Sequence, residues 1–200
     1  MADPLRRVVI RVGVLNLLYF GVEFAVALAI GSVSLFADSV DFLEDASINF
    51  LIALALGWTA AGRARVGMSL SAILLVPGCA TLITAWQKFS NPLAPAAAPL
   101  TIAGAGALVV NLSCAMMLLR FRRHSGSLTR AAFLSARNDA LANLAIIAAG
   151  VVTMFIVSGW PDLIVGIGIA IMNAGAAREV WVAARMEHHE TAQPQGAPQP

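Results

Sequence analysis

The chain has 200 residues, of which 59% are hydrophobic and only 12% are charged, and its mean hydropathy is +0.80. A globular domain carries about 25% charged residues, so this composition excludes an ordinary water-soluble protein and indicates an all-α membrane protein. The formal net charge of +2 gives no reason to expect a nucleic-acid partner. The partner that the composition implies is the lipid bilayer.

Six apolar runs are long enough to cross a bilayer, which takes about 20 residues. The predicted helices span residues 9–30, 33–60, 66–87, 98–119, 131–156 and 161–183. The first run lacks a small-residue cleavage site and is followed by further spans, so it predicts a membrane helix and not a signal peptide. We therefore expect one six-transmembrane-helix bundle, residues 1–186, and a disordered Pro- and Gln-rich tail, residues 187–200.

The basic residues predict how this bundle is oriented. Every arginine except Arg137 falls on the side that holds both chain termini, whereas Lys88 falls on the other side. Because loops rich in Lys and Arg stay in the cytoplasm, both termini are predicted to be cytoplasmic. We expect a multi-pass protein of the inner (cytoplasmic) membrane of a bacterium.

The second predicted helix carries an unusual set of acidic side chains at membrane depth, namely Asp38, Asp41, Glu44 and Asp45. An ionised side chain there costs about 2.5–3.5 kcal/mol on insertion scales, and like charges on one helix repel. At about 100° per residue, Asp38, Asp41 and Asp45 fall within an arc of about 60°, whereas Glu44 lies about 100° from Asp45. A bound cation would relieve the repulsion, so this stripe predicts a metal site.

The fifth predicted helix has a second polar stripe. Ser135, Asp139 and Asn143 follow one another at four-residue spacing, so they share one helix face. Asp139 is then able to meet Asp41 and Asp45 across a helix interface, and oxygen ligands of this kind suit divalent cations. The alternative for Ser135 and Asn143 is a hydrogen bond between helices, which membrane bundles often use.

The second-helix run GSVSLFADSVDFLED, residues 31–45, resembles the signature of the cation diffusion facilitator family. On this resemblance Asp41 and Asp45 match the two metal ligands of the signature. Asp38 matches an acidic position that many members carry just before them. The resemblance covers roughly residues 9–185 and implies export of a divalent transition-metal cation, in exchange for protons, by a secondary transporter.

The fifth-helix run SARNDALAN is similar to the corresponding family element and places Asp139 and Asn143 on its aspartate and asparagine. The family has His or Asp where this chain has Ser135, which is a weaker ligand, so Asn138 or water is the alternative for completing the site. Members also carry a cytoplasmic dimerisation domain after the sixth helix. We expect none here, so a homodimer would form through membrane helices.

Three other charged or polar residues have open roles. Arg137 lies about 160° from Asp139 on the helix; it is expected to pair with Glu44 or to reach the membrane interface, and the alternative is that it competes with the metal for Asp139. Asn16 and Glu23 share one face of the first helix. They are either part of a proton or ion relay along the bundle, or Glu23 is protonated and hydrogen-bonded to a neighbouring helix.

Other classes of function find little support in the sequence. No GxxxxGK[ST] motif is present, so ATP is not expected to drive transport, and no histidine lies near the acidic cluster, so an enzyme is not expected. No cofactor is expected beyond the transported cation, bound transiently. The oxygen-rich ligand set favours Mn²⁺, Fe²⁺ or Co²⁺, and the resemblance adds Zn²⁺ and Cd²⁺. The alternative function is a non-transporting paralogue that binds metal or regulates a partner.

The two cysteines, Cys79 and Cys114, fit no metal-binding spacing. We expect both to be small buried hydrophobic residues.

Overall fold

The structure is a computed structural model that describes residues 4–55, 79, 81–90, 92–119 and 126–172. Of residues 55 and 126–137 it describes the backbone alone. Throughout this part of the chain the regular secondary structure is helical, which confirms the predicted fold class. Most of the third predicted helix and the predicted tail, residues 187–200, lie outside the described residues.

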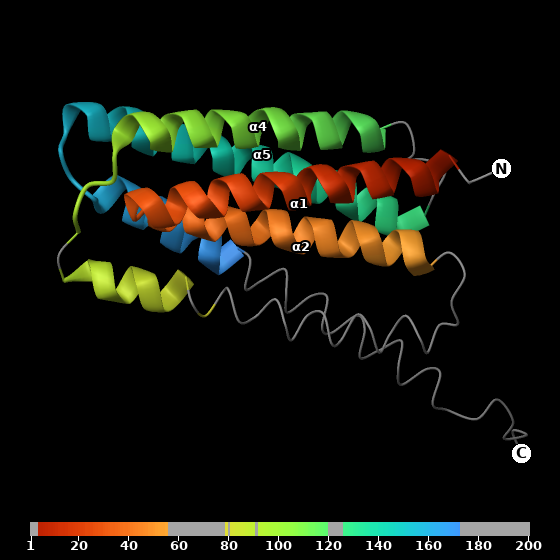
Figure 1. The fold of residues 1–200 in the computed structure, drawn as a ribbon, viewed down its shortest axis with the longest axis horizontal. Helices are drawn as coiled ribbons and strands as arrows, with labels where there is room; N and C mark the ends of the chain where they lie inside the picture. The colour runs from red at the N-terminus through yellow and green to blue at the C-terminus, as the bar shows by residue number, and fades with distance from the viewer. Residues whose placement is uncertain (1–3, 56–78, 80, 91, 120–125, 173–200) are drawn as a thin grey trace, which may run out of the picture.

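Four long helices make up most of the described chain (Figure 1). They are α1 (Pro4–Ile30), α2 (Val33–Ala55), α4 (Ala97–Leu119) and α5 (Gly126–Phe155). Two shorter helical segments cover residues 81–89 and Trp160–Met172. These six segments fall within the six predicted apolar runs or extend them by a few residues.

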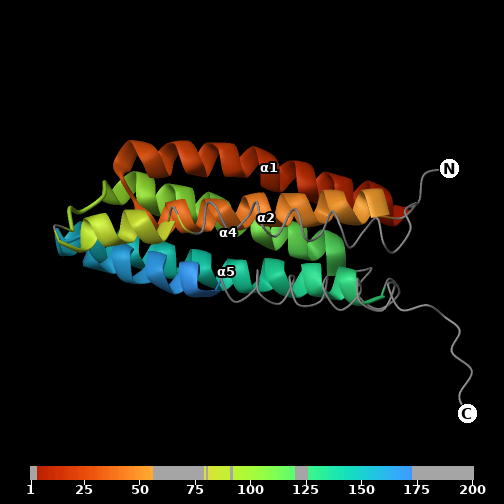
Figure 2. The same cartoon turned by 90° about the horizontal axis from the view of Figure 1, so that it is seen from below.

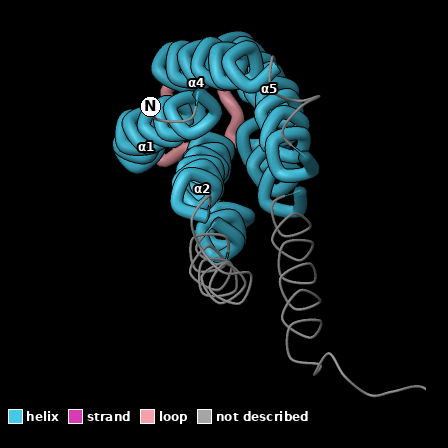
Figure 3. The backbone as a smooth tube through the Cα atoms, turned by 90° about the vertical axis from the view of Figure 1, so that its right-hand side faces the viewer, coloured by secondary structure: helices cyan, strands magenta, loops and turns pink. Residues whose placement is uncertain are grey.

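The long helices form two antiparallel pairs. α1 packs along α2 and α4 packs along α5, while smaller interfaces join α1 to α4 and α2 to α5. Figures 1 and 2 show that α1 begins and α2 ends at one end of the bundle, where α4 also ends and α5 begins. Seen along the helices (Figure 3), α4 lies beside both α1 and α5. The connections at the opposite end include the short turn from α1 to α2.

The helices have the length and surface of membrane spans. α1, α4 and the Asn138–Phe155 part of α5 are long and apolar enough to cross a bilayer, and α2 has a similar length of 23 residues but carries the four carboxyl groups. Large apolar side chains point away from the bundle, for example Leu18, Ile102 and Val109. Because an aqueous surface would not favour such an exposed apolar face, this is a multi-pass membrane bundle.

The charged ends of the helices agree with the predicted orientation. Arg6, Arg7 and Arg11 lie in the first turns of α1, at one end of the bundle. Lys88 lies at the other end, where a Cβ atom added to Gly31 would meet its Nζ at 3.1 Å. The positive-inside rule would place the end that holds the start of α1 at the cytoplasmic face, and this orientation stays a prediction.

Two helix starts and one cysteine differ from the sequence predictions. α1 begins at Pro4 and α5 at Gly126, each five residues before the predicted start, because helical hydrogen bonding continues through polar segments that the apolar pattern leaves out. Proline fits the first turn of a helix, where its missing N–H is not needed. Cys79 is exposed, so its predicted burial was wrong, whereas Cys114 is buried as predicted.

The turn between α1 and α2 is sharp and depends on glycine. Gly31 has φ 65°, a left-handed conformation that costs glycine little. The Ser32 amide donates to the Ala27 carbonyl at 3.0 Å, which ends α1 in the usual glycine-dependent way. The Ser32 hydroxyl then accepts from the Leu35 amide at 3.1 Å and caps the start of α2.

A second residue from far along the chain completes this cap. Asp162, at the start of the Trp160–Met172 helix, accepts from the Val33 amide at 2.8 Å, the Ser34 amide at 3.1 Å and the Ser32 hydroxyl at 2.6 Å. A Cβ atom on Gly166 would lie 2.8 Å from the Ser34 nitrogen, so glycine permits the close approach. We call Asp162 with Ser32, Val33 and Ser34 the α2 cap; it fixes the axial position of the acidic helix.

Candidate cation site

The regular helix that follows the α2 cap determines where its acidic side chains lie. Asp38, Glu44 and Asp45 are buried, and Asp41 is half-buried. Glu44 was expected away from the stripe of the other three, yet it also faces the interior and interacts electrostatically with Asp45. All the carboxyl groups of α2 therefore lie on the side of the helix that faces the bundle interior, away from lipid.

The packing of α2 against α5 brings Asp139 to this acidic surface. Asp139 is half-buried, and it is the strongest electrostatic neighbour of Asp41. Its carboxyl group is also within hydrogen-bonding reach of Asp45. Three carboxyl groups from two helices thus converge, and we call Asp41, Asp45 and Asp139 the carboxylate cluster.

The three carboxyl groups of the cluster do not by themselves form a complete metal coordination sphere. Among the described residues, no group of three or more Asp, Glu, His or Cys side chains has the geometry to hold a metal ion. Like charges at this proximity repel, and nothing in the described cluster draws them closer. What the packing provides is a set of carboxylate oxygens in one place, the kind of oxygen donors that divalent cations use.

The other residues predicted for the fifth helix have different surroundings. Asn143 is fully buried, and its Nδ2 donates to the Asp139 carbonyl at 2.6 Å while its Oδ1 has no hydrogen-bond partner. The backbone of Ser135 lies in α5, and its side chain and that of Arg137 are outside the described atoms. Of these residues, Asn143 therefore provides an amide oxygen close to Asp139.

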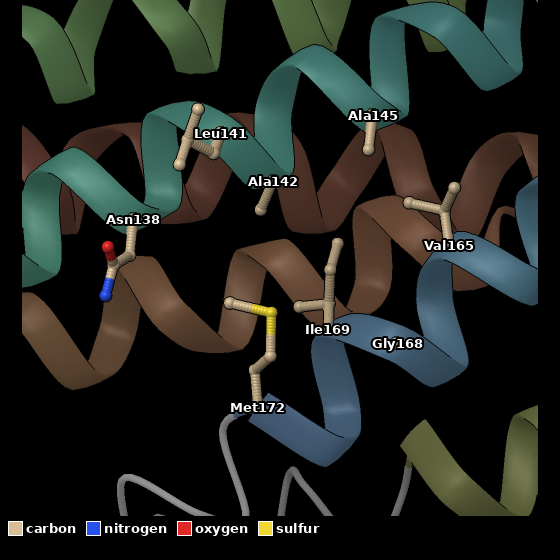
Figure 4. A pocket seen from close by; sticks show the side chains of 8 residues that line it. All are labelled: Asn138, Leu141, Ala142, Ala145, Val165, Gly168, Ile169 and Met172. Atoms are coloured by element: carbon tan, nitrogen blue, oxygen red, sulfur yellow. The ribbon is translucent and has the colours of Figure 1, made fainter.

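Asn138 faces a different part of the bundle. It is exposed and lines a cavity of about 370 Å³ between α5 and the Trp160–Met172 helix (Figure 4). The other side chains around this cavity are apolar, among them Leu141, Ile169 and Met172. Because consecutive residues of a helix differ by about 100° in direction, Asn138 and Asp139 project from α5 at different angles.

α1 supplies a polar side chain that contacts the carboxylate cluster. Asn16 is fully buried, and its Nδ2 donates to Asp45 Oδ2 at 3.5 Å. The Cys114 thiol of α4 donates in turn to Asn16 Oδ1 at 3.5 Å. At 3.5 Å the Asn16–Asp45 hydrogen bond is long and weak, so it mainly orients the two side chains. The sequence analysis singled out Asn16, but it gave Cys114 no polar role.

Asn49 was missed, although a repeated pattern in the sequence points to it. Its Nδ2 donates to the Asp45 carbonyl at 2.8 Å, and its buried Oδ1 has no hydrogen-bond partner. Asn143 stands in the same relation to Asp139. The spacing Asp-x-x-x-Asn thus occurs on both helices, and each time it leaves an amide oxygen unpartnered beside an aspartate of the cluster.

Comparison with known proteins agrees with this arrangement. The family model of the cation efflux transmembrane domain matches residues 9–185, which is most of the chain. The match includes every residue of the carboxylate cluster as well as Asn49 and Asn143. Among curated proteins, none matches the chain significantly.

Proposed function

The chain belongs to the cation efflux family, and from this premise we propose that it exports a divalent transition-metal cation from the cytoplasm in exchange for protons. Membership of the family makes it a membrane protein for cation transport. The metal, the protons and the direction of exchange are the parts that we propose.

The observation that supports this function best is the convergence of Asp41, Asp45 and Asp139 from two helices. Ionised carboxyl groups inside a membrane bundle are costly, and they are found mainly where ions or protons move. The same oxygens bind either a metal ion or protons, since a carboxylate must release its proton to become a ligand. Competition between the two provides the coupling that an exchanger needs.

The packing of the helices supports a route for alternating access. The cluster lies where α2 meets α5, and that interface is smaller than those within the α1–α2 and α4–α5 pairs. Rocking of one rigid unit against another around a central site is a common mechanism of secondary transporters. We propose that the two helix pairs tilt against each other, so that the cluster opens to one side of the membrane at a time.

We propose Asp41, Asp45 and Asp139 as metal ligands, with Asn143 or Asn49 as additional oxygen donors and Ser135 at the family's remaining position. A site made of oxygen donors favours Mn²⁺, Fe²⁺ or Co²⁺ over softer ions. Asn138 is the weaker candidate, because it lines the cavity beside the Trp160–Met172 helix. The family resemblance makes Zn²⁺ and Cd²⁺ two further candidate ions.

The wider assignment follows from the same premise. We propose a bacterial inner-membrane protein with cytoplasmic termini, a transmembrane domain of residues 1–186 and a homodimer formed through membrane helices. A non-transporting paralogue is the second candidate. The observation that favours it is the lack of a metal-ready group of three side chains among the described residues.

Transport by the purified full-length chain in proteoliposomes would decide between these functions. A pH-sensitive dye inside the vesicles should report proton movement when Mn²⁺, Co²⁺ or Zn²⁺ is added outside, and Asp45→Asn should remove the signal. The control is Ser113→Ala, because the exposed Ser113 hydroxyl donates to the Val109 carbonyl of its own helix. Metal binding without proton movement would favour the non-transporting paralogue, and neither binding nor movement would reject both.

A further inference from the structure

A second pair of buried carboxyl groups lies next to the carboxylate cluster, about one helix turn further along α2. Glu23 of α1 and Asp38 of α2 are both 0% exposed, and their side chains interact with each other. The two carboxyl groups lie within hydrogen-bonding reach of each other, and no other described group donates to any of their four oxygens. The sequence grouped Asp38 with Asp41 and Asp45, but the packing of α1 places Glu23 opposite it.

The position of this pair follows from the antiparallel packing of α1 and α2. Asn16 meets Asp45, and Glu23 and Asp38 are each seven residues further toward the turn at Gly31. Seven residues of α-helix span about 10 Å. The pair therefore lies about 10 Å from the Asn16–Asp45 contact, on the side away from the start of α1.

Among the side chains that the structure describes, none near the pair carries a positive charge that would balance two carboxylates. The charged groups that act on the pair from neighbouring positions are other acids, Asp41 on Glu23 and Asp45 on Asp38. Tyr19 is also near, but its hydroxyl donates to the Ala103 carbonyl at 2.6 Å. Buried polar atoms almost always have partners, and an exception calls for an ion or a water molecule.

A divalent cation accounts for the arrangement better than hydrogen bonding alone. A single proton held between two carboxyl groups makes one hydrogen bond and engages two of the four oxygens. A cation between them can be bound by oxygens of both groups and also reduces their repulsion. Carboxylate oxygens from two rigid helices, with waters completing the shell, suit hard ions such as Mn²⁺.

We propose that Glu23 and Asp38 form a second site for a hard divalent cation, separate from the carboxylate cluster and nearer to the extracytoplasmic end. The pair stands between the cluster and the turn at Gly31, where a cation that leaves the cluster in that direction would meet it. Binding at this site does not depend on transport, so it can be tested even if the proposed exchange fails.

The test counts Mn²⁺ bound to the purified full-length protein in detergent, by electron paramagnetic resonance after equilibrium dialysis. The wild type should bind about two Mn²⁺ per chain, and the double variant Asp45→Asn/Asp139→Asn should retain about one. Adding Glu23→Gln to that double variant should remove the remaining ion. Asp38→Asn, in place of Glu23→Gln, should do the same and provides a second route if one variant fails to fold.

The matched control is Glu44→Gln, which removes a buried carboxyl group of α2 outside the pair and should leave the Mn²⁺ of the double variant in place. The proposal is overturned if the double variant binds no Mn²⁺, or if Glu23→Gln leaves its Mn²⁺ unchanged. It is also overturned if infrared spectra show a protonated carboxyl band that disappears in Glu23→Gln but does not respond to Mn²⁺, since the pair would then hold only a proton.

Discussion

Replacing Asp162 with alanine should destabilise the bundle at the α2 cap. Asp162 is 2% exposed, and its two carboxyl oxygens accept from the Val33 amide at 2.8 Å and the Ser34 amide at 3.1 Å. The first N–H groups of a helix have no partners within the helix. Alanine would leave these two amides buried and without an acceptor.

The size of the effect can be worked out from these contacts. A buried donor left unsatisfied costs about 1–3 kcal/mol, so two amides cost roughly 2–6 kcal/mol. The Ser32 and Ser34 hydroxyls lose less, because they lie 3.3 Å apart and can bond to each other. We expect a loss of about 3 kcal/mol, which for a chain of this size lowers the Tm by about 6–12 °C. Asp162→Asn should cost less, because its amide oxygen still accepts from one donor.

The assay is thermal unfolding of the purified protein in detergent, followed by circular dichroism. A double-mutant cycle between Asp162→Ala and Ser34→Ala should give a coupling energy of at least about 0.5 kcal/mol, because the two residues share hydrogen bonds. Ser113→Ala, on the exposed side of α4, is the control. A Tm shift below about 2 °C for Asp162→Ala, or additive single effects, would refute the cap as a stabilising contact.

Three further changes test the site and the packing around it. Asp139→Ala should abolish metal-driven proton exchange without lowering the Tm, because it removes a carboxylate of the cluster, and unchanged flux in vesicles would contradict its role as a ligand. Ser135→His should raise Zn²⁺ affinity relative to Mn²⁺ by at least about tenfold in calorimetry, since imidazole is the softer ligand; an unchanged ratio would mean that residue 135 does not face the metal. Gly166→Leu should lower the Tm, because a Cβ there would lie 2.7 Å from Val33 Cγ1, and an unaltered Tm would show that the two helices can separate at no cost.

The acidic stripe of α2 illustrates what could be predicted. Helical periodicity alone placed Asp38, Asp41 and Asp45 on one face, and burial in the bundle agrees with it. The spacing of Asp139 and Asn143 likewise gave a shared face on α5. Glu44 was harder to place, because a helix surrounded on several sides by other helices has a buried face wider than a single stripe.

The membrane class, the helical segments and the acidic faces of α2 and α5 were determined by the sequence, because apolar length and the helical period are local properties of a chain. Only the tertiary structure decided which faces meet. The contact of Asn16 with Asp45, the pairing of Glu23 with Asp38 and the α2 cap each depend on how one helix is rotated and shifted along another. Packing of whole helix surfaces sets that rotation and shift. The residue pattern of a single helix carries no information about either of them.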